Sequence, residues 1–182
     1  AGGAWGADVA KIGDTPYETI AQAFTAAQSG DTITLLADVA PVLTSQRAIT
    51  AASVIDLNGY TMTLAEDDLY WGTTTFKNGN IVVDPSVSAS TAVFWMFAGQ
   101  TLTFDNVKLT ATGVSGTYLI GLEGADSNLN VINGSQIIID NASAVSLTSV
   151  IAANGTDDKI VIEDSSANVK NVGTFILFGD TT

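Results

Sequence analysis

The 182-residue sequence contains neither cysteine nor histidine. The absence of cysteine excludes disulfide bonds and thiolate metal sites. The absence of histidine excludes the Ser-His-Asp and Cys-His arrangements of nucleophilic catalysis. No apolar run reaches the ~18 residues that a membrane-spanning helix requires, and no basic stretch precedes an apolar one at the start, as it would in a signal peptide. We therefore expect no membrane insertion.

Basic residues are scarce: six Lys and Arg stand against nineteen Asp and Glu, which gives a formal net charge of −13. Nucleic acid is excluded as a partner, because neutralising its phosphates requires clustered Lys and Arg. An anionic membrane surface is disfavoured for the same reason. The acidity is typical of a soluble, sheet-rich surface, and the alternative is that it recruits Ca²⁺ or a basic partner.

Apolar residues make up 46% of the chain and charged residues only 14%. This composition favours a folded chain over a disordered one, and the length suits a single domain over residues 1–182. Gly, Thr, Ser, Asn and Val are frequent, whereas Pro occurs three times. Such a composition indicates many short strands joined by tight turns.

One helix is expected near the N-terminus, over residues 15–30. Thr15 occupies the N-cap position, Pro16 the first helical position, and Glu18 completes a capping box with Thr15. Gly30 ends the helix. The apolar residues within it follow one another at helical spacing and form a single stripe: Ile20, Ala23, Phe24 and Ala27.

After this helix the chain repeats itself. In four copies an apolar residue stands two places before an Asn or Asp, at intervals of 28, 27 and 31 residues, and Asn58 fits the same position 20 residues earlier. Periods of 20 to 50 residues indicate stacked architectures, and three short apolar segments per repeat with no helix between them are typical of a β-helix. The sequence therefore predicts an all-β fold, a right-handed parallel β-helix with three short strands per coil, over about residues 31–182. The repeated positions are Asn58, Asn78, Asn106, Asn133 and Asp164.

These five residues have a mechanical explanation. One corner of such a coil is turned by very few residues, one of which must adopt a left-handed backbone conformation, and Asn, Asp and Gly tolerate it best. We therefore expect them to form a structural ladder along one edge, with each amide bonded to the next, and to have no catalytic role.

The two ends of the β-helix are expected to differ. An open end exposes unpaired strand edges and an apolar interior, and Ile20 and Phe24 of the helix are expected to cover the N-terminal end. The chain stops after the first strand of a new repeat, whereas terminal repeats usually present a polar outer face. We therefore expect a longer natural protein or another covering element, and further domains of the same chain or self-association are open.

The opening string VAKIGDTPYETIAQAFTAAQSGDTITLLADV and the later IDLNGYTMTL, which lie within residues 9–64, resemble the start of right-handed β-helix surface proteins of Gram-positive and gut bacteria. These proteins belong to the pectin lyase-like superfamily. The resemblance implies an N-terminal capping helix, a secreted or cell-surface location, and adhesion or carbohydrate contact. The superfamily also contains polysaccharide lyases and hydrolases, so an enzyme fragment is an alternative.

Enzymes of this superfamily usually carry their catalysis on the outer face of the strands that here end near Gly99, Gly124, Gly155 and Gly179. Aligning these strands on their glycines predicts which residues point inward and which point outward. No outward residue is charged, Glu123 has no partner carboxylate, and Arg47 lies far away in sequence. Since hydrolases need paired carboxylates, we expect no catalytic residues. The predicted inward residues are Trp95, Ile120, Ile151 and Phe175, then Phe97, Leu122, Ala153 and Leu177; the outward ones are Phe94, Leu119, Val150 and Thr174, then Met96, Gly121, Ala152 and Ile176.

This alignment predicts an apolar outer ridge. A contiguous apolar stripe of this size is rare on a soluble monomer, so something is expected to cover it. The candidates are a folded-back segment at residues 86–92 or 142–149, a second copy of the chain, or the ligand. The ridge consists of Phe94, Met96, Leu119, Val150 and Ile176.

The candidate binding site combines Tyr70 and Trp71 with the acidic residues Glu66, Asp67 and Asp68. Tyr and Trp stack on sugar rings and anchor protein interfaces, and the carboxylates supply hydrogen-bond acceptors. The alternative is that the tryptophan belongs to the core. The expected partner is a carbohydrate or a host or bacterial surface protein.

Acidic turns raise the question of calcium. Asp157-Asp158, and Asp126 in the equivalent loop, could supply carboxylates, but the sequence contains no D-x-D-x-D-G run. We expect solvated turn residues and predict no metal or cofactor, with Ca²⁺ as the alternative. The leading function is a non-catalytic cell-surface binding or adhesin module, and the alternatives are a lyase- or hydrolase-like enzyme fragment and a structural spacer of a larger surface protein.

Overall fold

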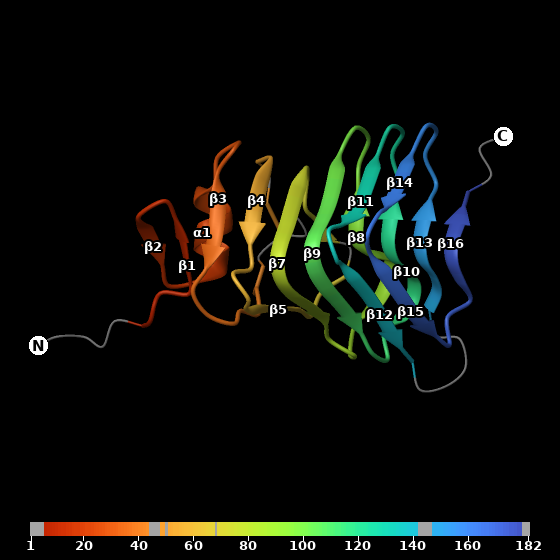
Figure 1. The fold of residues 1–182 in the computed structure, drawn as a ribbon, viewed down its shortest axis with the longest axis horizontal. Coiled ribbons are helices and arrows are strands. Elements are labelled where there is room, and N and C mark those ends of the chain that lie inside the picture. Colours follow the sequence, from red (N-terminus) through yellow and green to blue (C-terminus); the bar gives the residue numbers. More distant parts are fainter. Residues whose placement is uncertain (1–5, 44–47, 50, 68, 142–146, 180–182) are drawn as a thin grey trace, which may run out of the picture.

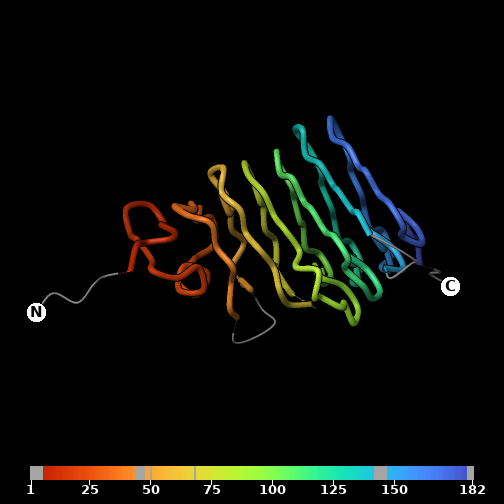
Figure 2. The backbone as a smooth tube through the Cα atoms, turned by 90° about the horizontal axis from the view of Figure 1, so that it is seen from below, coloured from red at the N-terminus to blue at the C-terminus, as the bar shows by residue number. Residues whose placement is uncertain are grey.

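The computed structural model describes residues 6–43, 48–49, 51–67, 69–141 and 147–179. It shows the predicted all-β fold: a parallel β-helix in which successive coils stack along one axis (Figure 1). The near strands run down the view and the far strands run up while the chain advances from N- to C-terminus, so the coil is right-handed (Figure 1). The tube in Figure 2 shows the same coils leaning along this axis.

Three strands build each complete coil, and equivalent strands form three faces. Face A contains β3 (Thr32–Leu35), β4 (Ser53–Asp56), the first halves of β7 (Thr74–Val83) and β9 (Thr101–Ala111), β11 (Asn128–Ile132) and β14 (Lys159–Ile162). Face B contains β5 (Thr61–Leu64), the second halves of β7 and β9, β12 (Gln136–Asp140) and β15 (Ser166–Lys170). Face C contains β6 (Leu69–Tyr70), β8 (Ser88–Met96), β10 (Ser115–Leu122), β13 (Leu147–Ala153) and β16 (Thr174–Phe178).

The N-terminal helix is shorter than predicted. Residues 15–17 form strand β2 (Thr15–Tyr17), which pairs antiparallel with β1 (Ala10–Ile12) across a tight turn at Gly13, where φ is 56°. The helix α1 spans Ile20–Ala26, and its capping box joins Thr19 to Gln22. The T-x-x-E/Q pattern occurs twice in succession, and the hairpin uses the first copy as strand, so the helix begins at the second.

The helix covers the N-terminal end of the coil, as predicted. Its apolar stripe is buried, with Phe24 4% and Ile20 4% exposed. The rings of Phe24 and Trp71 form a T-shaped pair with 5.6 Å between their centroids. Beyond Trp71 the interior continues as a column of rings: Phe76 and Phe104 stack at 5.7 Å, and Phe94 stands edge-on to both. Such pairs add about 0.5–1.5 kcal/mol each beyond simple burial.

The corner between faces A and B has the predicted left-handed residues. All five repeated residues have positive φ, between 47° and 59°. Their side chains do not form one continuous ladder: Asn106 donates to Asn78 at 3.2 Å, but Asn58 donates to the carbonyl of Leu35 and Asn133 to Asp105. The backbone conformation repeats at every coil, whereas the side-chain acceptor changes with the neighbouring residue.

A second left-handed corner leads from face C to face A. Its residues are Gly72, Gly99, Asp126 and Asp157, with φ of 65°, 72°, 59° and 59°. Gly99 N–H donates to the carbonyl of Ala125, and Asp126 N–H to that of Thr156, so these corners stack on one another. The acidic turns at Asp126 and Asp157 are therefore corners of the coil.

The predicted orientation of face C is wrong for β8 and β16. The pairing joins Phe94 to Ile120, Ile120 to Ile151, and Ile151 to Ile176, so the glycine alignment is one residue off in β8 and β16. The glycines serve different purposes. Gly99 turns a left-handed corner, while Gly124 has no positive φ and lies flat against the backbone of Ala98 in the preceding coil.

The predicted apolar outer ridge is therefore wrong for its members on β8 and β16, which are Phe94, Met96 and Ile176. Phe94 and Met96 point into the core, Leu119 and Val150 are also fully buried, and Ile176 is half-buried. Residues 88–92 belong to strand β8, so this segment is no folded-back cover. Residues 142–146 lie outside the described residues.

Replacing Phe24 by Asp is expected to lower the free energy of unfolding by about 3–5 kcal/mol, because the core loses an aromatic ring and gains an unpaired charge. Thermal and urea unfolding measure this change. Thr25→Asp on the exposed side of the same helix is the control and should cost less than about 1 kcal/mol. Equal stability of both variants would show that the helix does not seal the core.

Substitutions at the two kinds of glycine are expected to differ in their effect on the stability of the protein. A Cβ at Gly124 would collide with the backbone of Ala98, so Gly124→Ala is expected to cost about 1–3 kcal/mol or more. A Cβ at Gly99 meets nothing within 4 Å, and Asn tolerates its left-handed backbone, so Gly99→Asn should change stability by less than about 0.5 kcal/mol. Urea titrations of both variants test this assignment, and the reverse order of stability would contradict it.

Candidate functional site

The candidate site is a patch of three aromatic side chains on the outside of face C. Tyr70 of β6 pairs in register with Trp95 of β8, and their rings meet at 5.2 Å. Phe97, just after β8, stacks on Tyr70 at 4.6 Å with 27° between the ring planes, and lies 6.2 Å from Trp95. Phe97 is 39% exposed, and the other two are half-buried. We call Tyr70, Trp95 and Phe97 the aromatic patch.

The strand alternation decides which of two adjacent aromatic residues reaches the surface. Tyr70 and Trp71 are neighbours, so they point to opposite sides. Trp71 is 1% exposed and packs against Phe24, Phe76 and Phe94. Trp71 is therefore a core residue, and its predicted place in the binding site is wrong.

Sequence reasoning missed Trp95 and Phe97 because the glycine alignment turned them inward. The signal that finds them is the pairing of β6 with β8: once Tyr70 points outward, its in-register neighbour Trp95 must do so too. The indole N–H of Trp95 is buried and bonds to none of the described residues. The part of the Trp95 ring that faces solvent is therefore apolar.

Two of the three predicted carboxylates are held by backbone donors. Asp67 accepts a hydrogen bond from the N–H of Ser90 at 3.0 Å, and Glu66 accepts one from the N–H of Leu43 at 3.4 Å. Both side chains are half-buried. A carboxylate has about four acceptor positions, so each keeps capacity for further donors. Asp68 lies outside the described residues.

The remaining outward positions in register with Trp95 are small or apolar. They are Gly121, Ala152 and Leu177 on the three following strands. Glu123 lies near this row and accepts a hydrogen bond from the side-chain amide of Asn154 at 2.9 Å. Arg47 lies outside the described residues.

The acidic corners use their carboxylates to close turns. Asp158 accepts hydrogen bonds from the N–H groups of Ser127 and Gly155, at 3.0 and 2.8 Å. In the described part of the chain no three Asp or Glu residues gather closely enough to hold a metal ion. The hydroxyl and N–H of Ser86 lower the pKa of Asp84, which likewise closes a turn.

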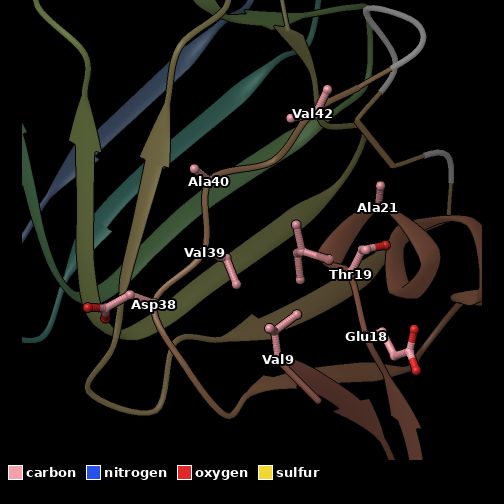
Figure 3. Close-up of a pocket in the computed structure, with 9 residues that line it drawn as sticks. Val9, Glu18, Thr19, Ala21, Asp38, Val39, Ala40 and Val42 are labelled. Carbon is pink, nitrogen blue, oxygen red and sulfur yellow. The ribbon is translucent and has the colours of Figure 1, made fainter. Parts of the chain in front are cut away.

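A pocket of about 330 Å³ lies beside the capping helix, between residues 38–42 and the start of α1. Val9, Val39 and Ala40 line its apolar walls (Figure 3). Figure 3 shows the carboxylates of Glu18 and Asp38 at opposite ends, both directed away from the centre. The Asp38 carboxylate accepts a hydrogen bond at 2.9 Å from the N–H of Thr61, which lies outside the pocket lining. The pocket therefore offers no converging polar groups.

The two adjacent aromatic residues predict different effects on stability. Trp71→Ala is expected to cost about 3–5 kcal/mol, because it leaves a cavity in the ring column. Tyr70→Ala removes only surface ring contacts and should cost about 1 kcal/mol. Urea unfolding of the two variants measures the difference, and a larger loss for Tyr70→Ala would contradict the assignment of the two sides.

Comparisons with known proteins do not assign a family to this chain. No family model, no curated protein and no solved structure matches it. Among the described residues, no helix has the length and apolar character needed to cross a membrane. The parallel β-helix fold is established by the structure itself. The pectin lyase-like superfamily remains a resemblance in the sequence alone.

Proposed function

We propose that this protein is a non-catalytic cell-surface binding module that contacts carbohydrate through the aromatic patch. The observation that supports the proposal is the arrangement of Tyr70, Trp95 and Phe97, three rings in mutual contact on the outside of one strand face. The location rests on the resemblance of residues 9–64 to bacterial surface proteins.

Ring chemistry favours a sugar as the occupant. A pyranose ring has an apolar face of C–H groups that packs against an aromatic ring, while its hydroxyls need polar partners. The patch presents ring surface, and the carboxylates of Glu66 and Asp67 precede Tyr70 with acceptor capacity left over. Sites that combine apolar surface with a few placed polar groups are typical of small-ligand recognition.

The patch is also rigid before any ligand arrives. Tyr70 and Trp95 stand on strands joined by parallel backbone pairing, and Tyr70 is held between two other rings. Binding to such a surface costs little side-chain ordering, which otherwise amounts to about 0.5–1.5 kcal/mol for each immobilised side chain. A surface protein is the other candidate partner, because Tyr and Trp also anchor protein interfaces.

The non-catalytic part of the proposal rests on the residues next to the patch. The in-register neighbours Gly121, Ala152 and Leu177 cannot transfer protons. A glycosidase would need two carboxyl groups about 5–10 Å apart across the scissile bond. The nearby Glu123 is bonded to the neutral amide of Asn154. A binding role requires no such pair.

The test is titration of the protein with β-linked glucohexaose, xylohexaose and mannohexaose by calorimetry. Tyr70→Ala and Trp95→Ala are expected to weaken binding of the recognised glycan about tenfold or more, since each removes a ring of the platform. Tyr60→Ala is the matched control, because Tyr60 is a partly exposed tyrosine on the corner between faces A and B. The Tyr60→Ala variant should bind the recognised glycan with the same affinity as the parent protein.

Two results would contradict the proposal. Binding that survives both patch variants would place the ligand elsewhere. Shortened or unsaturated oligosaccharides after prolonged incubation, detected by mass spectrometry, would establish the enzyme alternative. If none of the glycans binds while a surface protein does so through Tyr70, the partner class is protein.

A further inference from the structure

The corner between faces A and B changes length along the β-helix, and this change creates a hollow. Thr61, Asn80, Lys108 and Gln136 occupy one register position on four successive coils. From the preceding corner asparagine, the chain takes two residues to reach Asn80 and Lys108 but three to reach Thr61 and Gln136. The two middle coils therefore turn more tightly than their neighbours.

The tight coils are those in which β7 and β9 run through the corner as continuous strands of 10 and 11 residues. The coils on either side each insert one extra residue, after Gly59 and after Gly134. Two recessed coils between two longer ones leave a hollow of about 480 Å³. Since coils are spaced by ~4.8 Å, the recess is about 10 Å wide along the axis.

Gly79 and Gly134 are part of the lining of the hollow. A Cβ at Gly79 would overlap the side chain of Leu57 and the carbonyl of Tyr60, so this position must stay bare. Gly134, with a φ of 80°, forms part of the opposite rim. Gly79 therefore allows the coil of β7 to pack closely against the preceding coil beside the hollow.

The walls carry hydrogen-bond donors on three adjacent coils. Asn80, Lys108 and Gln136 line the hollow from one register position. Their side chains make no hydrogen bond or ion pair with any described residue, whereas Lys77 and Lys170 each lie within 4 Å of an aspartate. The corner residues Asn78 and Asn106 complete the lining and are bonded to each other.

The charge of the hollow is opposite to that of the molecule. The whole chain carries a formal charge of −13, yet the described lining holds one lysine and no carboxylate. The carboxylate of Asp105 on face A, close to the corner, accepts a hydrogen bond from the side-chain amide of Asn133 at 2.9 Å. Asp164 turns the adjacent corner, where its backbone carbonyl accepts a hydrogen bond from the N–H of Gly134 at 2.7 Å, and salt at 0.1 M screens charges beyond about 10 Å.

We propose that this hollow binds a tetrahedral oxyanion, a sulfate or phosphate ester carried on a small hydroxyl-bearing molecule. Lys108 provides the charge, and the amides of Asn80 and Gln136 donate from either side, so three donors meet a group with three terminal oxygens. Planar carboxylates favour the bidentate fork of arginine, whereas lysine meets phosphate as a point charge. The site is independent of the aromatic patch, which lies on face C.

The experiment follows the side-chain amide signals of isotope-labelled protein by NMR during titration with glucose 6-sulfate, glucose 6-phosphate and glucose. The two esters are expected to shift the signals of Asn80 and Gln136, and glucose is not. Lys108→Met should weaken ester binding about tenfold, the usual effect of losing a hydrogen bond to a charged group. Lys159→Met, at an exposed lysine on face A, is the matched control and should leave the affinity unchanged.

The pH dependence of binding distinguishes a site for sulfate esters from a site for phosphate esters. A sulfate site binds the sulfate ester equally across pH 5–8, whereas a site for phosphate dianions strengthens as the ester loses its second proton near pH ~6. Equal shifts with glucose, or unchanged ester binding in Lys108→Met, would overturn the proposal. Tyr70→Ala must not affect this titration, so failure of the aromatic patch as a glycan site and failure of the oxyanion site are separate outcomes.

Discussion

Parallel hydrogen bonding between successive coils places equivalent residues one strand spacing apart, about 4.8 Å, and this constraint shapes the rest of the molecule. A residue that turns a corner in one coil lies against the residue that turns the next, so both need the same backbone conformation. Asn78 and Asn106 share their left-handed φ for this reason, as do Asp126 and Asp157. The same spacing stacks Phe76 on Phe104 in the core.

The outer surface obeys the same constraint, and its two candidate sites arise from it in different ways. On face C, in-register stacking gathers Tyr70 beside Trp95, and the chain just past β8 adds Phe97. At the corner between faces A and B, one residue fewer in each of two coils produces the hollow around Lys108. One site thus arises where the repeat is regular and the other where its length changes.

The sequence predicts the architecture well because corners reveal themselves in residue type. A left-handed position is costly for most side chains, so Asn and Asp recur where the backbone demands them, as at Asn133 and Asp164. The capping helix was predictable from its apolar stripe around Phe24 but not its first residue, because two similar capping patterns follow one another. The tight turn at Gly13 decides between them by folding residues 15–17 into a hairpin.

The candidate site was less predictable than the fold, because a strand position changes side with every residue. A shift of one residue exchanges the core and solvent faces of a whole strand. An alignment on glycines can miss such a shift, because one glycine turns a corner and another permits close packing of coils. The two roles cannot be told apart from the sequence. The alignment of Gly99 with Gly124 therefore kept the β-helix intact but turned Trp95 inward. In a β-helix, the corners determine the fold, and the register between them determines which side chains a partner can reach.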